Sequence, residues 1–331
     1  MILRVPLNKA QEALTELKPY YDSRYKTKRE DGFLFIPLIN KVKQEFGVYV
    51  KEDLTPAKHH QRYQEALQGK LTEEELEMLP TSFEIVGDIL ILDLPDGLKP
   101  KKRDIGAALL AANKNIKTIL MKTGQHEGEF RTIKLECIAG EDKRETIHKE
   151  NNIRLKLDVE QVYFSARSST ERKRICSQVK KGENVLVMFS GCGPFTMSIA
   201  KNTDARNVVG VEKNPIGHKY ALENARLNKI KCDSRCGDVR DVVPTLGKFD
   251  RILMPLPKDA DTFLDTAFLA AKKGTMIHMY DFEHESETEK AWEKVVQAAD
   301  KEKICCKHIQ TVKCGQYSPG KFRLCVDFQV L

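Results

Sequence analysis

The chain lacks a long apolar run, a Cys-x-x-Cys pair and any low-complexity or repeated tract. A helix that spans a membrane needs roughly 20 apolar residues in a row, and no stretch of the 331-residue sequence approaches that length. Its nine cysteines are scattered and odd in number, which supports neither a disulfide framework nor a zinc ribbon. These absences predict a cytoplasmic protein, outside the membrane, that holds no metal.

Positive charge is in modest excess, with a formal net charge of +7 at pH 7. That excess alone is too small to indicate binding to nucleic acid. The basic residues do gather, however, at 24–29, 99–103 and 167–174. Each cluster alone is typical of a solvated surface, whereas together they favour a polyanionic partner.

The pattern of apolar and polar residues divides the chain into three parts. Residues 1–70 predict a small mixed unit, and an acidic helix over 71–79, stopped by Pro80, follows as a connector. Residues 80–160 are rich in strands and contain one helix, which indicates an α+β domain. From 161 to 331 strands and helices alternate.

The third part predicts a doubly wound α/β sheet. We expect strands at 185–189, 208–212, 251–254 and 275–280, and helices at 169–179, 194–202, 215–228, 259–272 and 286–301. The last two strands, at 304–312 and 322–330, predict an antiparallel pair at the end of the sheet. An ending of this kind favours a methyltransferase over a dehydrogenase.

A glycine turn and an acid mark the most informative segment. The apolar run 185–189 leads directly into Ser-Gly-Cys-Gly-Pro, which predicts a strand, a tight turn and the start of a helix. Glu212 ends the next apolar strand, about twenty residues after the glycines. That spacing is typical of a carboxylate that binds the ribose hydroxyls of an adenosine-type cofactor.

The turn fits some cofactors better than others. A dinucleotide site needs a third small residue where the helix packs on the strand, and this chain has Thr196 there, with Pro194 in the turn. These bulky neighbours weaken a pyrophosphate site and disfavour a nicotinamide oxidoreductase. They suit S-adenosylmethionine, whose amino-acid end can lie against the bare backbone of Gly191 and Gly193. The alternative is that the glycines serve only the tight turn.

Several motifs resemble one known family. They are Gly128–Thr132, Ala139–Glu141, Thr146–Asn151, Val162–Arg167, Thr170–Arg172 and Met254–Lys258. In this order they are similar to the archaeal and eukaryotic tRNA (guanine-N1)-methyltransferases, from about residue 82 to the C-terminus and less clearly before it. The resemblance implies a class I (Rossmann-like) methyltransferase domain with antiparallel C-terminal strands and smaller α+β N-terminal domains.

The resemblance also implies a reaction. The family transfers a methyl group from S-adenosylmethionine to N1 of the tRNA guanosine immediately 3′ of the anticodon, position 37, and a sister branch builds the wybutosine side chain there. It further implies a monomer that binds the anticodon loop, with residues 1–70 recognising a distant part of the tRNA, 80–160 contributing to RNA binding and the active site, and 161–331 binding the cofactor.

Two residues match the family's catalytic pair. Guanine N1 carries a proton, so methylation needs a base that removes it and a donor that stabilises negative charge on O6. The resemblance places Glu171 as the base and Arg131 as the donor. From the sequence alone, Glu171 could instead be a first-turn or capping residue of its helix, and Arg131 a salt-bridge residue of a strand.

The resemblance assigns the remaining site residues. The aromatic side chains of Tyr163 and Phe164 would wall the methyl donor. Contacts to the cofactor would further come from Phe189, Gly191, Gly193, Glu212, Lys213, Asp238, Val239, Pro255, Leu256 and Pro257. Of these, Asp238 would meet the adenine amino group. RNA contacts would come from Arg131, Arg167, Arg172 and Lys258.

Pro255 departs from the family pattern. Many members carry asparagine there, whose side-chain amide can bond the target base, and proline offers neither that amide nor a backbone N–H. The departure leaves the wybutosine-pathway reactions open, either methylation of a carbon of the tricyclic base or transfer of the aminocarboxypropyl group. A non-catalytic RNA-binding protein is a third possibility, which the complete cofactor set disfavours.

Overall fold

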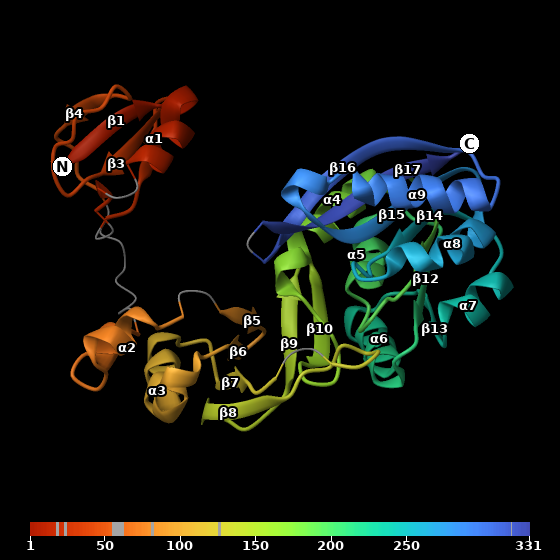
Figure 1. The fold of residues 1–331 in the computed structure, drawn as a ribbon, viewed down its shortest axis with the longest axis horizontal. Helices are drawn as coiled ribbons and strands as arrows, with labels where there is room; N and C mark the ends of the chain where they lie inside the picture. The colour runs from red at the N-terminus through yellow and green to blue at the C-terminus, as the bar shows by residue number, and fades with distance from the viewer. Residues whose placement is uncertain (18–19, 23–24, 55–62, 81–82, 125–126, 319) are drawn as a thin grey trace. The chain divides into compact units, whose positions relative to one another are not determined.

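The computed structural model describes residues 1–17, 20–22, 25–54, 63–80, 83–124, 127–318 and 320–331 (Figure 1). Two compact units divide the chain, Met1–Thr72 and Glu73–Leu331. No helix among these residues is long and apolar enough to cross a membrane. Arg24, part of the first basic cluster, lies outside the described residues.

The first unit is a small antiparallel sheet with one helix. Its strand order is β2-β3-β1-β4, with β2 at Lys28–Glu30, β3 at Phe33–Pro37, β1 at Ile2–Pro6 and β4 at Val48–Val50. Helix α1, Ala10–Glu16, packs its apolar face on the sheet. Alternation along β1 buries Leu3 and Val5 and leaves Arg4 exposed, as expected for a sheet with one face in the core.

The second unit begins with an α+β part. Helix α2 covers Glu73–Glu77, and a four-stranded sheet follows in the order β5-β6-β7-β8, at Glu84–Val86, Ile89–Leu92, Thr118–Lys122 and Leu135–Gly140. Helix α3, Lys102–Ala112, lies against β8 so closely that a Cβ on Gly106 would be 3.0 Å from the carbonyl oxygen of Ile138. Glycine therefore permits this packing.

A two-stranded hairpin, β9 (Glu145–Glu150) and β10 (Ile153–Asp158), comes next. The outer edge of β10 is paired by side chains of helix α6, Pro215–Asn228. The amide of Asn224 bonds both the N–H and the C=O of Lys156, at 2.7 and 3.0 Å, and Asn228 does the same for Arg154 at 2.8 and 2.6 Å. These bonds satisfy an otherwise open strand edge and fix the hairpin to the following sheet.

The remainder forms a seven-stranded sheet in the order β13-β12-β11-β14-β15-β17-β16. Its strands are β11 Asn184–Val187, β12 Asn207–Glu212, β13 Asp233–Cys236, β14 Phe249–Met254, β15 Ala271–His284, β16 Cys306–Ser318 and β17 Lys321–Val330. The first five run parallel, and β17 pairs antiparallel with both β15 and β16.

Helices cover both faces of this sheet. One face is covered by α4 Ser169–Gln178, α5 Pro194–Asn202 and α6. The other is covered by α7 Val239–Val242, α8 Leu264–Ala270 and α9 Lys290–Lys301. Alternate residues of β11 enter separate cores: Val185 and Val187 pack with α4 and α5, whereas Leu186 packs with α7, α8 and α9. The residues of this central strand that are buried on both faces, Val185–Val187, are therefore all apolar.

The structure changes some expected boundaries. Helices α5 and α6 have the predicted ends, 194–202 and 215–228. The helix expected over 259–272 is shorter, because Ala260–Phe263 forms a 3-10 turn before α8. The one expected from 286 begins at Lys290, and the strand expected over 275–280 extends over the whole of β15.

Candidate active site

A cavity of about 270 Å³ lies at the carboxyl ends of the parallel strands. This is where α/β sheets of this kind bind ligands. Most of the predicted site residues line it, namely Arg131, Tyr163, Phe164, Glu171, Arg172, Phe189, Gly191, Glu212, Lys213, Asp238, Val239, Pro255, Leu256 and Pro257. Gly193, Arg167 and Lys258 are not in its lining, and the last two are exposed.

A similar number of residues that line the cavity were not predicted from the sequence. They are Glu129, Phe130, Val162, Ser165, Ser168, Ser190, Pro194, Phe195, Asn214, Arg240, Phe263, Tyr280 and Arg323. Several are neighbours of predicted residues and could have been found from the same motifs. Phe263, Tyr280 and Arg323 come from the 3-10 turn before α8, from β15 and from β17, and no local sequence signal places them there.

The glycine turn owes its shape to backbone conformations that few residues adopt. Gly191 and Gly193 have φ of 57° and 90°. A Cβ on Gly193 would lie 3.0 Å from Cε of Met197, so this buried residue shapes the turn without lining the cavity. Phe189 has φ of 57°, which costs a side-chain-bearing residue about 1–2 kcal/mol. Its ring meets Phe263 edge-on at 4.9 Å.

Glu212 lies across this turn. Its Oε2 accepts a hydrogen bond from the backbone N–H of Gly191 at 2.6 Å, and its Oε1 accepts one from Asn214 at 2.8 Å. Burial raises the pKa of Glu212, and the backbone N–H groups oppose that rise only in part. The carboxylate is thus fixed where the 21-residue separation from Gly191 predicted a ribose-binding acid.

Asp238 begins helix α7 beside it. Its Oδ1 accepts from the N–H of Arg240 at 2.9 Å, and its Oδ2 lies 2.9 Å from Nζ of Lys213. That backbone N–H and the Lys213 ammonium lower the pKa of Asp238. Lys213 also forms an ion pair with Glu129, so it joins the 127–132 loop to the side of the cavity where Asp238 lies.

Glu171 lies in the first turn of α4 and is 5% exposed. Its partner Tyr280 is on β15, three strand positions from β12 and Glu212, so the two carboxylates lie toward opposite ends of the cavity. The two oxygens of Glu171 accept hydrogen bonds from Nε and Nη2 of Arg174, both at 2.7 Å. Oε1 also accepts one from the hydroxyl of Tyr280 at 2.7 Å. A carboxylate has about four acceptor positions, so these bonds leave one on the cavity-lining residue for a ligand.

Arg172 is enclosed in the wall of the cavity. Its side chain is 3% exposed and donates to both oxygens of Glu150, at 2.5 and 2.6 Å. Its guanidinium carbon lies 5.3 Å from the ring centroid of Phe164. Burial works to raise the pKa of Glu150, but hydrogen bonds from His148 and Arg172 lower it overall. Arg172 is therefore held tightly in the wall of the cavity that it lines, and its predicted contact with RNA stays a prediction.

Arg131 lies in a turn and not in a strand. Its N–H bonds the carbonyl of Gly128 at 3.2 Å, and its φ is 51°. The guanidinium carbon lies 4.8 Å from the ring centroid of Tyr163, which holds the cation against the cavity wall. Pro255 lines the cavity in the turn after β14, where the N–H of Leu256 bonds the carbonyl of Met254 at 2.8 Å.

The sheet order and the cavity together define a class of protein. A parallel sheet with an antiparallel last pair, a glycine turn after its first strand and an acid ending its second are features of Rossmann-like, nucleotide-cofactor methyltransferases. The comparisons with known proteins narrow this class.

A family model described as the TRM5/TYW2 methyltransferase domain matches residues 146–307, and a TYW2 N-terminal domain model matches 63–143. The Pyrococcus abyssi protein named tRNA (guanine(37)-N(1))-methyltransferase Trm5b is 38% identical, with 100% of this chain and 99% of that protein covered. A Pyrococcus horikoshii protein named tRNA(Phe) (4-demethylwyosine(37)-C(7)) aminocarboxypropyltransferase is 33% identical, over 81% of this chain and 96% of that protein.

Among solved structures, Methanocaldococcus jannaschii TYW2 in complex with AdoMet superposes with a TM-score of 0.58. It is 28% identical and covers 76% of this chain and 100% of its own. The chain belongs to the TRM5/TYW2 methyltransferase family. The predicted family, the Rossmann-like fold and the class of enzyme are thereby confirmed.

Proposed function

We propose that the protein methylates N1 of guanosine 37 in tRNA with S-adenosylmethionine as the methyl donor. The observation that carries the proposal is that Glu212, Glu171 and Arg131 line one cavity, with the two carboxylates held at different strands of the sheet. The full-length similarity to a protein named for this reaction supports it. The partner is therefore tRNA, which the names of both relatives share.

The residues present fit the cofactor. Glu212 offers a carboxylate to ribose hydroxyls, while Phe189 and Phe263 give apolar walls for an adenine ring or a thioether. The backbone of Gly191 carries no side chain that would block the amino-acid end. S-adenosylmethionine supplies a methyl group on a positively charged sulfur, and its departure leaves a neutral thioether.

The protein's own groups handle the proton and the charge. We assign to Glu171 the proton of guanine N1, which passes to the carboxylate as the N1 lone pair forms its bond to the methyl carbon. Arg131 is assigned to O6, where negative charge develops as that proton leaves. The target base must leave the stacked anticodon loop to reach these groups, as in other enzymes that modify a base.

The other residues predicted to contact RNA differ in how exposed their side chains are. Arg167 and Lys258 are exposed and are assigned to the RNA backbone, whereas Arg172 is assigned to holding the cavity wall. We further propose the predicted domain roles: tRNA recognition by residues 1–70, where Lys26 and Arg29 are exposed, RNA contacts from 80–160, and cofactor binding by 161–331 in a monomer.

The test is a methyl-transfer assay with unmodified tRNA that carries guanosine at position 37, followed by mass spectrometry of the nucleosides. The expected product is N1-methylguanosine, and a tRNA with adenosine at position 37 is the matched control. Wild-type protein that binds the donor but makes no methylguanosine would overturn the proposal.

A second reaction on the same nucleotide is favoured by one feature. Pro255 lines the cavity, and as proline it gives the base neither a side-chain amide nor an N–H. A 33% identical relative is named for aminocarboxypropyl transfer to the tricyclic base. A tRNA that carries 4-demethylwyosine distinguishes the alternatives, since a methyl group and an aminocarboxypropyl group differ in mass.

A further inference from the structure

Behind Glu171, away from the cavity, the structure holds a second carboxylate on the same arginine. The guanidinium of Arg174 donates Nε and Nη2 to Glu171 and Nη1 to Oδ2 of Asp327, the last at 2.6 Å. The side chain of Asp327 is 0% exposed, and neither Asp327 nor Arg174 lines the cavity. One cation is therefore shared by two buried anions.

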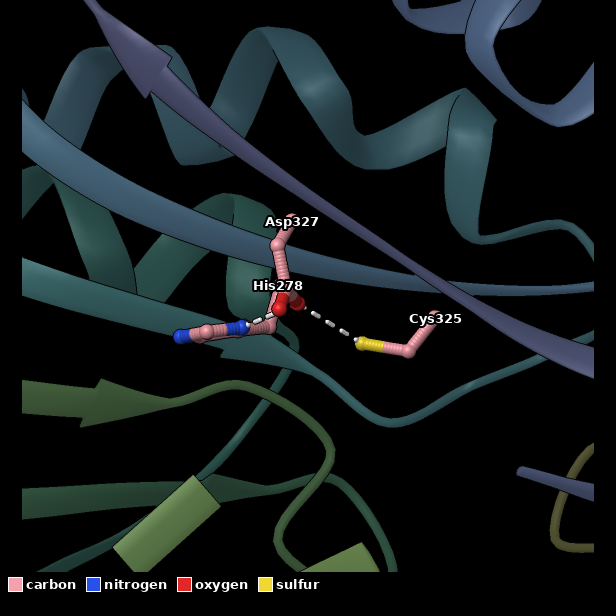
Figure 2. Close-up of side chains that lie close together, drawn as sticks. All are labelled: His278, Cys325 and Asp327. Carbon is pink, nitrogen blue, oxygen red and sulfur yellow. Dashed lines mark hydrogen bonds and ion pairs between the residues drawn. The ribbon is translucent and has the colours of Figure 1, made fainter. Parts of the chain in front are cut away.

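Asp327 is held in turn by a histidine (Figure 2). Nδ1 of His278 lies 2.6 Å from Oδ1 of Asp327, and Nε2 of His278 lies 2.6 Å from Nη1 of Arg251. A guanidinium can only donate, so Nε2 is the acceptor and the imidazole proton is on Nδ1, where Asp327 accepts it. His278 is therefore neutral in this arrangement and leaves the charge of Asp327 to Arg174.

His278, Cys325 and Asp327 place donor atoms within 4.8 Å of one another, which is metal-ligand spacing. Their hydrogen bonds favour a different role. Both ring nitrogens of His278 are engaged, and the guanidinium groups of Arg174 and Arg251 approach the cluster directly. A divalent cation there would face two positive charges at contact distance.

We propose that Asp327 is a positioning residue for Glu171 that acts through Arg174, an inference that rests on the proposed function. A guanidinium bound to one carboxylate stabilises its anionic form and makes it a weaker base. A second carboxylate on the same guanidinium offsets part of that charge. Asp327 therefore keeps Glu171 able to accept the N1 proton, while two hydrogen bonds from Arg174 hold the Glu171 carboxylate at the cavity wall.

The groups around this pair come from every element packed against it. Glu171 meets Arg174 on its own helix and Tyr280 on β15. Facing Asp327 are Arg174 and Gln178 from α4, His278 from β15, Gln310 from β16 and Cys325 from its own strand. Of these, the side chain of Gln310 belongs to an exposed residue and reaches Asp327 at 2.7 Å, so it can be changed at little cost to the core.

The experiment compares pH–rate profiles of methyl transfer for wild type and Asp327→Asn. Removal of the charge leaves Arg174 serving Glu171 alone, so we expect kcat to fall about tenfold or more and the acid limb to move to lower pH. KM for donor and tRNA should stay within about twofold, because the cavity lining is unchanged. Asp250→Asn is the matched control, since that carboxylate pairs with Lys272 outside the cavity.

Gln310→Lys keeps the inference testable if Asp327→Asn does not fold. It keeps a donor to Asp327 and adds positive charge that offsets part of the Asp327 charge, so the acid limb should again move to lower pH. A wild-type profile in both variants, or a loss of thermal stability with no movement of the limb, would overturn the inference. Wild-type protein without methyl transfer would instead overturn the proposed function, which keeps the two failures distinct.

Discussion

The two ends of the cavity hold their carboxylates by different means. Glu212 accepts hydrogen bonds from the backbone N–H groups of Gly191 and Asn214, which the chain itself positions. Glu171 is held by side chains: Arg174 in its own helix, and Tyr280, which is 109 residues away. Through Arg174 it is tied to Asp327, 153 residues from that arginine.

Under the proposed function, this difference separates a group that binds the cofactor from a group that reacts. Backbone dipoles fix a carboxylate rigidly but add no full charge, so burial still raises the pKa of Glu212. Side-chain partners bring full charges, and their own partners can change how strongly they act. A cofactor site gains from the first arrangement, and a proton acceptor whose strength must be set gains from the second.

The largest effect is expected from Glu171→Gln at the reacting end. The amide cannot take the N1 proton, so kcat should fall about 10²- to 10⁴-fold. Binding of S-adenosylmethionine, measured by calorimetry, should be unchanged, because the cofactor groups lie at the other end. Unchanged turnover in this variant would show that Glu171 is not the base.

Glu150→Gln tests how the ion pair of Glu150 and Arg172 stabilises the wall of the cavity, through the dependence of stability on pH. The pKa of Glu150 is lowered from its ordinary value of 4.5, so its stabilising contribution is present above that value and is lost as pH falls through the folded-state value. We expect the variant to be less stable than wild type by about 3 kcal/mol at pH 7, since Arg172 is left buried without its partner. Urea denaturation between pH 7 and pH 3 should show this deficit shrinking below pH 4.5. A deficit that is constant over that range would contradict the assignment.

Glu212→Gln should affect binding more than chemistry. Loss of a charged hydrogen-bond acceptor for the ribose should weaken S-adenosylmethionine binding by about 1.5–3 kcal/mol. At saturating donor, kcat should remain within a few-fold of wild type. The opposite pattern, unchanged donor affinity with a large fall in kcat, would place Glu212 in the chemistry and remove the contrast between the two ends.

The smallest effect is expected from Lys213→Ala. The ion pairs of Lys213 with Glu129 and Asp238 join side chains that are 44%, 61% and 22% exposed. Exposed pairs of this kind contribute little to stability, and salt screens them. Thermal denaturation should therefore show a small loss of stability at low salt that disappears at high salt. A larger loss, insensitive to salt, would mean that Lys213 supports the cavity in another way.

Local signals in the sequence predicted much of the α/β sheet. Helices α5 and α6 have the expected bounds because each begins at a proline in its first position, Pro194 and Pro215, shortly after a strand with an apolar middle. Strand β13 was missed, since Asp-Ser-Arg-Cys at 233–236 carries no apolar pattern and forms at the sheet edge. There, pairing with β12 decides the conformation, and intrinsic propensity does not.

Local order along the chain accounts for the arrangement around Glu212, because Gly191, Glu212 and their hydrogen bonds follow from one strand, one turn and the next strand. The motifs of the family likewise pointed to Glu171 and Arg131. The surroundings of Glu171, in contrast, depend on the tertiary fold. Its partner Tyr280 lies on β15, and Asp327, which it reaches through Arg174, lies on β17. The order of strands in the sheet brings both to α4, and residue spacing along the chain does not predict these contacts. The same packing encloses Arg172 against Glu150, because a charge cluster in the sequence does not show which of its members the core will bury.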